Sequence, residues 1–171
     1  MDMIIKGLES VPFSGSDIMQ ILNNKSKIMR YSDLTEFNHI DEVLSPYDNV
    51  VILYETKPNY GHWVCIMKHH ERRPYLEFFD SYGLAPDEQL RFIKHGFRSP
   101  VLTQLLSESR YPVIYNKQQL QDDYHNVSTC GRHVCMRLIM MEYPLSSYLR
   151  MFKSNKNRPD EIVTYLTAFQ E

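Results

Sequence analysis

The densest apolar runs lie in the middle of the chain, at residues 49–54, 62–68 and 75–80. The first run is rich in β-branched residues and is bounded by turn residues, which is typical of a buried strand. The second alternates and is rich in strand-forming residues, and the third ends at Asp80 before a Ser-Tyr-Gly turn. Because only short segments separate the three runs, the pattern predicts an antiparallel meander.

Helical spacing marks the regions on both sides of these runs. Ser14 and Asp17 offer N-cap chemistry ahead of an apolar pattern at 18–22, and Pro86 opens a helix that Gly96 caps. The other predicted helices cover residues 38–44, 101–108, 130–143, 145–152 and 159–169. The last helix is expected to bury its apolar positions, which are Ile162, Tyr165, Leu166 and Phe169.

A fourth strand is predicted at residues 112–115, at a sheet edge if Pro112 belongs to it. Residues 27–31 offer a short extended segment, and residues 1–13 show no clear periodicity. The order of helices, three strands, helices, strand and helices indicates an α+β protein with a small, mostly antiparallel central sheet flanked by helices. No linker or repeat interrupts this order, so we expect residues 1–171 to form a single domain.

Composition and charge narrow the functional classes. The 43% apolar and 23% charged content is a globular mixture, and the net charge of −2 gives no global basic field for tight non-specific nucleic-acid binding. The N-terminal residues lack a signal-peptide pattern, and no apolar run approaches about 18 residues, so neither secretion nor a membrane span is expected. Three cysteines do not suggest a disulfide scaffold, and they favour a reducing, intracellular compartment.

Cys130 lies where a polar loop meets the apolar pattern of a predicted helix. At a helix N-terminus, unpaired backbone N–H groups and the helix dipole favour negative charge. A thiolate is such a charge, so this position suits a nucleophilic cysteine. The same N–H groups are suited to binding an oxyanion.

Two further residues complete a candidate triad. His62 begins one predicted strand and Asp80 ends the next, so antiparallel pairing of these strands would place both at one rim of the sheet. A base and an orienting acid beside a thiol are what nucleophilic catalysis by cysteine requires. Taken singly, each residue also has an ordinary structural interpretation: a packed histidine, a turn aspartate and an inert buried cysteine.

The other cysteines suggest no second site. Cys65 is internal to a strand pattern and Cys135 lies on the apolar face of the predicted helix, so both are interpreted as core residues. The spacing Cys130-x-x-His133-x-Cys135 does not match a structural zinc site, and we expect no metal or other cofactor. Three glutamines, Gln118, Gln119 and Gln121, lie just upstream of Cys130 and could supply a side-chain amide to an oxyanion hole.

The ordered set Gly61-His62-Trp63-Val64, Phe79-Asp80-Ser81-Tyr82-Gly83 and Gln121…Thr129-Cys130-Gly131 resembles the adenain-like cysteine proteases. This superfamily includes the adenovirus maturation protease, the SUMO-deconjugating proteases and relatives in large DNA viruses and virophages. The resemblance spans about residues 50–140, and the Cys-Gly-Arg-His version is closest in style to the viral members. It implies His62 as general base, Asp80 as orienting acid and Cys130 as nucleophile.

The same resemblance implies an oxyanion hole and a substrate cleft. The family's glutamine commonly lies about six residues before the nucleophile, where this chain has Tyr124. We therefore assign the oxyanion hole to Gln121, with Gln119 as the alternative, together with Gly131. Trp63 matches a tryptophan that lines a narrow cleft for small residues such as Gly-Gly or Gly-X; its alternative interpretation is a core aromatic.

Three functions remain open from the sequence. The first is an endopeptidase that matures viral precursors, the second a deubiquitinase or SUMO-type deconjugase, and the third an inactive module that binds such modifiers. Acyl transfer to an acceptor other than water is a further alternative that the resemblance implies, since some relatives in this superfamily are acetyltransferases. The expected partner is a protein substrate. We expect the protein to be a monomer and to act in the host cytoplasm, the nucleus or the virion. The adenovirus enzyme uses DNA and a peptide as cofactors, but nothing in this sequence indicates either.

Overall fold

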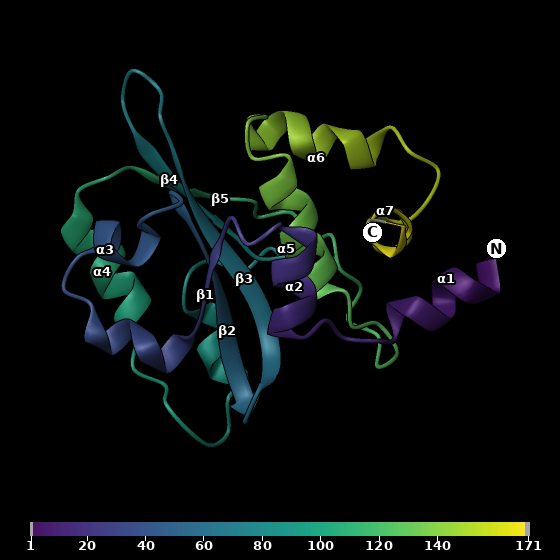
Figure 1. The fold of residues 1–171 in the computed structure, drawn as a ribbon, viewed down its shortest axis with the longest axis horizontal. Coiled ribbons are helices and arrows are strands. Elements are labelled where there is room, and N and C mark those ends of the chain that lie inside the picture. Colours follow the sequence, from purple (N-terminus) through teal and green to yellow (C-terminus); the bar gives the residue numbers. More distant parts are fainter. Residues whose placement is uncertain (1, 170–171) are drawn as a thin grey trace.

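The computed structural model describes residues 2–169 and contains one five-stranded sheet with the order β1-β2-β3-β4-β5 (Figure 1). The strands are β1 (Lys27–Arg30), β2 (Asn49–Lys57), β3 (Tyr60–His69), β4 (Tyr75–Phe79) and β5 (Val113–Tyr115). Strands β2, β3 and β4 form the antiparallel meander, and the edge strands β1 and β5 pair parallel to their neighbours. Parallel pairing needs a crossover connection, and helical segments supply one on each side.

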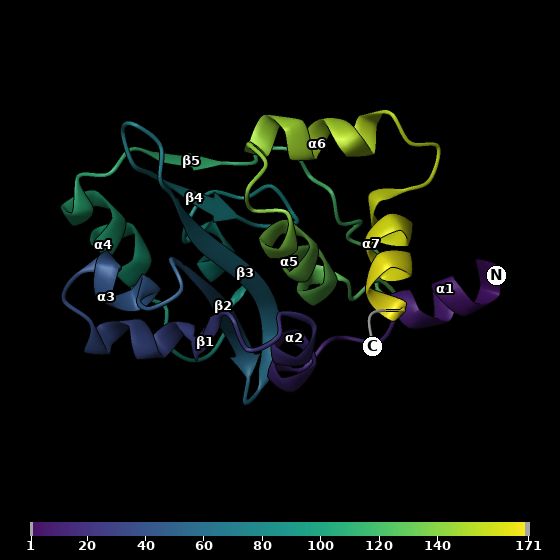
Figure 2. The ribbon, with the colours of Figure 1, turned by 45° about the horizontal axis from the view of Figure 1, so that its top comes forward.

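Helices cover both faces of this sheet, which confirms the α+β class (Figures 1 and 2). The first face carries η1 (Tyr31–Glu36), α3 (Ile40–Leu44) and α4 (Val101–Ser109). The second face carries α2 (Gly15–Ile21), α5 (Cys130–Ile139), α6 (Leu145–Lys153) and α7 (Pro159–Ala168). The remaining helices are α1 (Asp2–Glu9), which packs on α7, and the short η2 (Glu88–Phe92).

The central strands are apolar on both sides because both faces of the sheet are covered. In β2, Val51 and Leu53 belong to the core beneath α5, whereas Val50 and Ile52 belong to the core beneath α3 and α4. The apolar run at residues 49–54 therefore reflects burial on two faces. Helix α5 crosses β3 and supports the strand that carries His62.

The prediction of a helix from Pro86 to His95 is wrong, because only a short 3₁₀ segment, η2, forms there. Asp87 adopts a left-handed backbone conformation with φ of 68° and does not continue into a helix. Its carboxylate instead accepts hydrogen bonds from the hydroxyls of Tyr31 and Tyr54, and from the backbone N–H and hydroxyl of Thr103. Tertiary hydrogen bonds have thus overridden the proline-acid helix signal.

Two other helix boundaries differ from the sequence pattern. Residues 2–9 form α1, although their sequence shows no clear periodicity. Helix α5 ends at Ile139 instead of continuing to residue 143, and the Arg137 side chain donates to the carbonyl oxygens of Met140 and Tyr143 just beyond this end.

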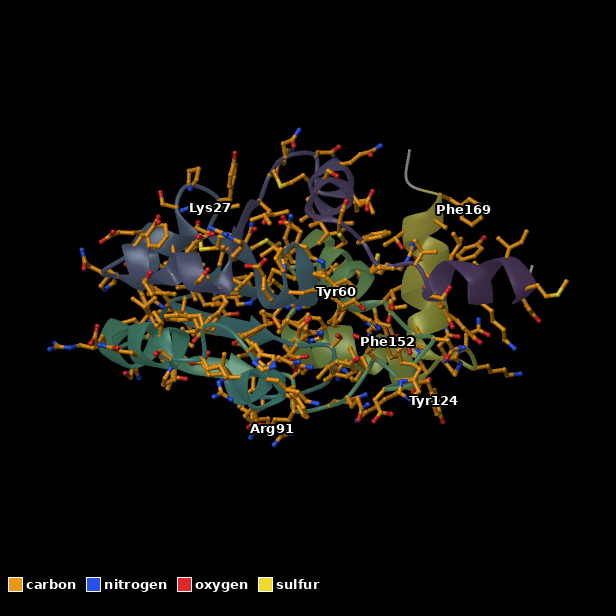
Figure 3. All side chains as sticks on the ribbon, turned by 90° about the horizontal axis from the view of Figure 1, so that it is seen from below. Lys27, Tyr60, Arg91, Tyr124, Phe152 and Phe169 are labelled. Atoms are coloured by element: carbon orange, nitrogen blue, oxygen red, sulfur yellow. The ribbon has the colours of Figure 1, made fainter. Side chains whose placement is uncertain are left out.

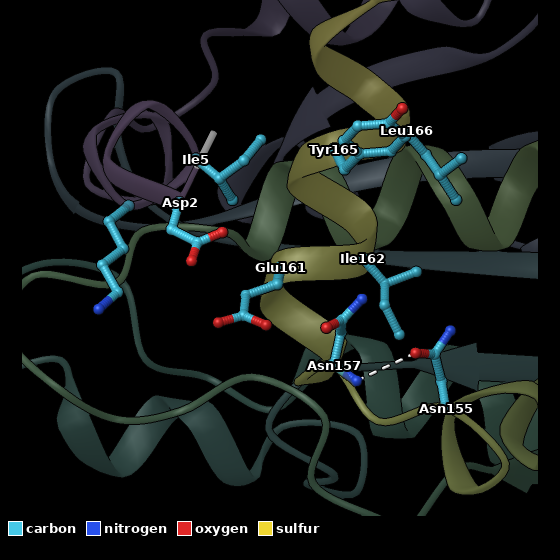
Figure 4. Close-up of a pocket in the computed structure, with 9 residues that line it drawn as sticks. Asp2, Ile5, Asn155, Asn157, Glu161, Ile162, Tyr165 and Leu166 are labelled. Atoms are coloured by element: carbon cyan, nitrogen blue, oxygen red, sulfur yellow. Dashed lines mark hydrogen bonds between the residues drawn. The ribbon is translucent and has the colours of Figure 1, made fainter.

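Helix α7 buries a different face from the one predicted. Val163, Thr164 and Thr167 are buried, whereas Tyr165, Leu166 and Phe169 remain exposed. Figure 3 shows Phe169 at the outer end of α7. A surface hollow of about 550 Å³ lies between α1 and α7 and is lined by Ile162, Tyr165 and Leu166 among others (Figure 4). The α7 face that meets the core is partly polar because it carries Asp160 and two threonines that take part in buried contacts.

Candidate active site

His62 and Asp80 meet at one rim of the sheet, as antiparallel pairing of β3 and β4 predicts. Nε2 of His62 lies 2.7 Å from Oδ1 of Asp80, and both side chains are almost fully buried. The pairing of Cys65 with Phe79 fixes the register that brings the start of β3 beside the residues that follow β4. On its other side, β3 approaches β2 so closely that a Cβ on Gly61 would collide with the carbonyl oxygen of Tyr54, so the residue before His62 must be glycine.

Neighbouring groups hold this pair in place. The backbone N–H of Tyr82 donates to Oδ1 of Asp80 at 2.8 Å, and the Tyr82 ring stacks on the His62 imidazole with centroids 4.7 Å apart. Asn116 hydrogen-bonds the backbone N–H and carbonyl of Asp80. The orientation of the imidazole is therefore fixed on two sides, by a carboxylate edge and by an aromatic face.

Cys130 is the first residue of α5 and lies beside His62. Burial alone would lower the pKa of His62, but the charge and hydrogen bond of Asp80, together with those of Cys130, raise this pKa to about 10. Burial likewise raises the pKa of Tyr82 to about 12, with added effects from the charges of Cys130 and Asp80. The predicted triad residues thus share one nearly closed site.

Trp63 lies between the start of α5 and the N-terminal segment. Its indole N–H donates to the carbonyl oxygen of Phe13 at 2.9 Å, and the ring packs against Gly131 and Gly15. A Cβ on Gly131 would lie 2.8 Å from Cβ of Phe13, so this close approach requires glycine. Trp63 is part of the core, and it also lines a surface hollow of about 410 Å³ with Asn59 and Ser14.

Gln121 and Gln119 occupy different environments. Gln121 is buried, and its side-chain oxygen accepts a hydrogen bond from the hydroxyl of Ser81 at 2.7 Å. The carbonyl oxygen of Ser81 also accepts from the backbone N–H groups of Leu120 and Gln121. The exposed Gln119 uses its amide to donate to the carbonyl oxygen of Gln121.

Sequence reasoning missed the contributions of Ser81 and Tyr82, which directly follow Asp80. Ser81 orients the amide of Gln121 and Tyr82 covers the ring of His62. Their only sequence signal is that they continue the Phe-Asp-Ser-Tyr-Gly turn. Gly83 completes this turn with φ of 75°, packed so tightly on the backbone of Gln118 and Gln119 that a Cβ would approach it within 3 Å.

Cys65 and Cys135 are core residues, as predicted. Both are fully buried, and burial raises the pKa of Cys65 well above its ordinary value and that of Cys135 to about 12. Residues 2–169 hold no group of three or more His, Cys, Asp or Glu side chains arranged to bind a metal ion. Among the helices of the same residues, none is long and apolar enough to cross a membrane.

The fold is similar to that of the ASFV pS273R protease. Two crystal structures of that protein align with TM-scores of 0.55 and 0.56 at 16% and 13% sequence identity. Each alignment covers 95% of this chain, and 69% and 68% of the protease, respectively. At these identities the similarity establishes the fold.

A closer relative comes from sequence comparison, whereas no protein-family profile matches the chain. The uncharacterized protein V9 of Sputnik virophage is 36% identical over 173 residues, which cover 95% of this chain and 98% of V9. Identity at this level over nearly the full length of both chains indicates common descent. The chain therefore belongs to the same family as the V9 protein of Sputnik virophage.

Proposed function

We propose that this protein is a cysteine protease in which His62, Asp80 and Cys130 form the catalytic triad. The observation that carries the proposal is the 2.7 Å contact between His62 and Asp80 beside Cys130 at the start of a helix. Asp80 engages Nε2, which leaves Nδ1 of His62 to exchange a proton with the thiol. This arrangement of nucleophile, base and orienting acid is the one that acyl transfer requires.

In the proposed reaction, His62 takes the proton of the Cys130 thiol before substrate binds, and the resulting thiolate, paired with the imidazolium, attacks the carbonyl carbon of the substrate. The oxyanion binds the backbone N–H groups at Cys130 and Gly131 and the side-chain amide of Gln121. Collapse of this intermediate breaks the C–N bond while His62 protonates the leaving amine. Water then attacks the thioester, releases the carboxylic acid and restores the thiol.

Gln121 suits the oxyanion hole better than Gln119. The Ser81 hydroxyl donates to Oε1 of Gln121, so its Nε2 is the end left to donate to an oxyanion. Nε2 makes no hydrogen bond within residues 2–169 and is not among the fully buried unsatisfied atoms of that range. Gln119 is exposed and already donates to a backbone carbonyl.

The substrate we propose is a viral protein precursor cut after small residues of the Gly-Gly or Gly-X type. Trp63 and Phe13 pack closely over Gly131, next to the nucleophile, which leaves little room for a large side chain. The viral origin of the V9 relative and the fold shared with a viral protease support a viral substrate.

Active-site probes test this proposal. Ubiquitin, SUMO and Gly-Gly-X peptides that carry a C-terminal electrophile should be compared on wild-type and Cys130→Ala protein. We expect peptide labelling that Cys130→Ala abolishes and that Asp80→Ala slows about 100-fold or more, since the base loses its orienting group. Labelling by a modifier instead would indicate a deconjugase, and peptide cleavage that persists in Cys130→Ala would refute the triad.

A further inference from the structure

The loop between Gln121 and Cys130 is long and largely exposed, yet both of its ends belong to the proposed site. Residues 123–126 are solvent-exposed, whereas Gln121, Thr129 and Cys130 are buried. Within the loop, the backbone N–H of Val127 donates to the carbonyl oxygen of Tyr124. A loop of this length needs an anchor if Gln121 and Cys130 are to keep a fixed separation.

A buried carboxylate on α7 contacts both ends of this loop. Oδ2 of Asp160 accepts from the backbone N–H of Asp122 at 2.9 Å, and Oδ1 accepts from the hydroxyl of Thr129 at 2.5 Å. Asp122 directly follows Gln121, and Thr129 directly precedes Cys130. Oδ1 also lies 2.9 Å from Nε2 of His133, one turn along α5.

The surroundings of Asp160 favour its negative charge. The side chain is fully buried, and burial alone would raise the pKa of this carboxyl. The hydrogen bond and the charge of His133 lower this pKa instead, and hydrogen bonds from the Thr129 hydroxyl and the backbone N–H of Asp122 lower it further. Asp160 also lies in the first turn of α7, where the helix dipole favours an anion.

We infer that Asp160 is a positioning residue that fixes Gln121 relative to Cys130, so that the oxyanion hole is assembled before substrate binds. This inference rests on the proposed protease function. Asp160 does not touch the reacting atoms; it acts through the backbone of Asp122 and the hydroxyl of Thr129. Helix α7 is therefore part of the active-site architecture, although it comes last in the described chain.

The experiment compares Asp160→Asn and Asp160→Ala with wild type. Asp160→Asn keeps one acceptor oxygen, whereas Asp160→Ala removes both. Thr164→Val is the matched control, because Thr164 is fully buried on the same helix and its hydroxyl has no hydrogen-bond partner within residues 2–169. Each variant is assayed for turnover of a Gly-Gly peptide amide, alkylation of Cys130 by iodoacetamide, and backbone hydrogen exchange of residues 121–130.

We expect kcat to fall about 10-fold in Asp160→Asn and about 100-fold in Asp160→Ala, since small misplacements of catalytic groups cost rates of this order. KM should change little. Hydrogen exchange in residues 121–130 should become faster in Asp160→Asn and faster still in Asp160→Ala. The alkylation rate should stay within about twofold of wild type, because alkylation needs the thiolate but no oxyanion hole. Thr164→Val should match wild type in every assay.

Other outcomes separate this inference from the proposed function. If kcat is unchanged in Asp160→Ala, or if kcat and alkylation fall together, Asp160 is not a positioning residue of the oxyanion hole. If wild-type protein cleaves no peptide, the proposed function fails, and the exchange data decide whether Asp160 holds the loop. Unchanged exchange in both Asp160 variants would overturn that anchoring role as well.

Discussion

At the scale of single residues, the charge of His62 depends on its two neighbours, Asp80 and Cys130, in the proposed triad. Burial disfavours the imidazolium, while Asp80 and Cys130 stabilise it strongly enough to raise the pKa of His62 from 6.5 to about 10. This raised pKa stabilises the folded protein at and below pH 6.5, and the stabilisation is lost as the pH rises through about 10. In the proposed acylation step the imidazolium is the acid that protonates the leaving amine.

The pH dependence of kcat/KM should report this charge. In wild type, kcat/KM should fall as the pH rises through about 10, because His62 then loses its proton. Asp80→Asn removes the negative partner and should move this alkaline limb down by more than about one pH unit. Asp48→Asn, a change to an exposed carboxylate that pairs with His70, is the control and should leave the limb in place. An identical limb in wild type and Asp80→Asn would exclude the pairing of Asp80 with His62 as the cause.

Ser81 should affect turnover only through Gln121. Ser81→Ala removes the hydroxyl that donates to Oε1 of Gln121 and leaves the amide free to rotate. We therefore expect kcat to fall about 5-fold, which corresponds to one lost hydrogen bond of about 1 kcal/mol. A double-mutant cycle measures the dependence. The combined Ser81→Ala and Gln121→Ala protein should be no slower than Gln121→Ala alone; strictly additive losses would contradict the coupling.

At the scale of elements, buried charges hold α5 near both of its ends. Asp160 contacts the start of the helix, and Glu77 on β4 binds Arg137 near its end. Both contacts between Glu77 and the guanidinium are 2.8 Å long, and both side chains are fully buried. Burial alone would raise the pKa of Glu77, but hydrogen bonds from Arg137 and His69 lower it. Helix α5 therefore has little freedom to slide along the sheet and displace Cys130.

Breaking the second of these ion pairs should destabilise the whole fold. Arg137→Met leaves the buried carboxylate of Glu77 with the His69 imidazole as its remaining side-chain partner among residues 2–169, so the free energy of unfolding should drop by about 3 kcal/mol. Adding Glu77→Leu should recover most of the loss, because the buried charge disappears. Urea denaturation at pH 7 measures these changes, with the exposed Arg150→Met as the control expected within about 0.5 kcal/mol of wild type. A small loss in Arg137→Met would show that water reaches Glu77.

At the scale of the whole molecule, the two ends of the chain converge on the centre of the site. The carbonyl oxygen of Glu9 accepts from the backbone N–H of Ser128, and the Glu9 carboxylate pairs with Arg158 ahead of α7. Phe13, further along this N-terminal segment, packs on Gly131. The guanidinium of Arg132 lies over the Phe13 ring, 4.2 Å from its centroid. The proposed site is thus enclosed by segments more than 100 residues apart in the sequence.

The contact of Phe13 with Gly131 can be tested by substitution and rescue. Gly131→Ala adds a Cβ only 2.8 Å from Cβ of Phe13, so Phe13 must move and its hydrogen bond with Trp63 should break. We expect kcat/KM to fall about 10-fold or more, with a shift in emission from Trp63, the only tryptophan in the chain. Phe13→Gly in the same protein removes the clashing Cβ and should restore part of the activity. Unchanged emission in Gly131→Ala would show that the segment yields without disturbing Trp63.

Local pattern was sufficient for much of the fold. The strands β2, β3 and β4 and the helices α2, α3, α4, α6 and α7 lie close to the segments that apolar periodicity and turn residues predict. The pattern failed where contacts between distant residues determine the local structure. The hydroxyls of Tyr31 and Tyr54 donate to Asp87, where a helix was predicted, and α1 packs against α7, where no helix was predicted. The pattern also assigned the wrong buried face to α7, because a pattern of apolar residues does not show that a buried aspartate and a buried threonine can be hydrogen-bonded, as Asp160 and Thr167 are.

The sequence by itself determined the antiparallel pairing of β2, β3 and β4, the order of His62, Asp80 and Cys130, and the meeting of the first two at one rim. These features follow from short runs of residues and from strands that are close together in the chain. Only the tertiary structure decided which glutamine is buried against Ser81, which groups Asp160 contacts at the two ends of the loop before Cys130, and how closely Phe13 packs on Gly131. Those contacts join positions far apart in the chain, and no local pattern of apolar and polar residues encodes them. Their physical basis is the need of buried polar groups for partners, which only the folded chain can supply.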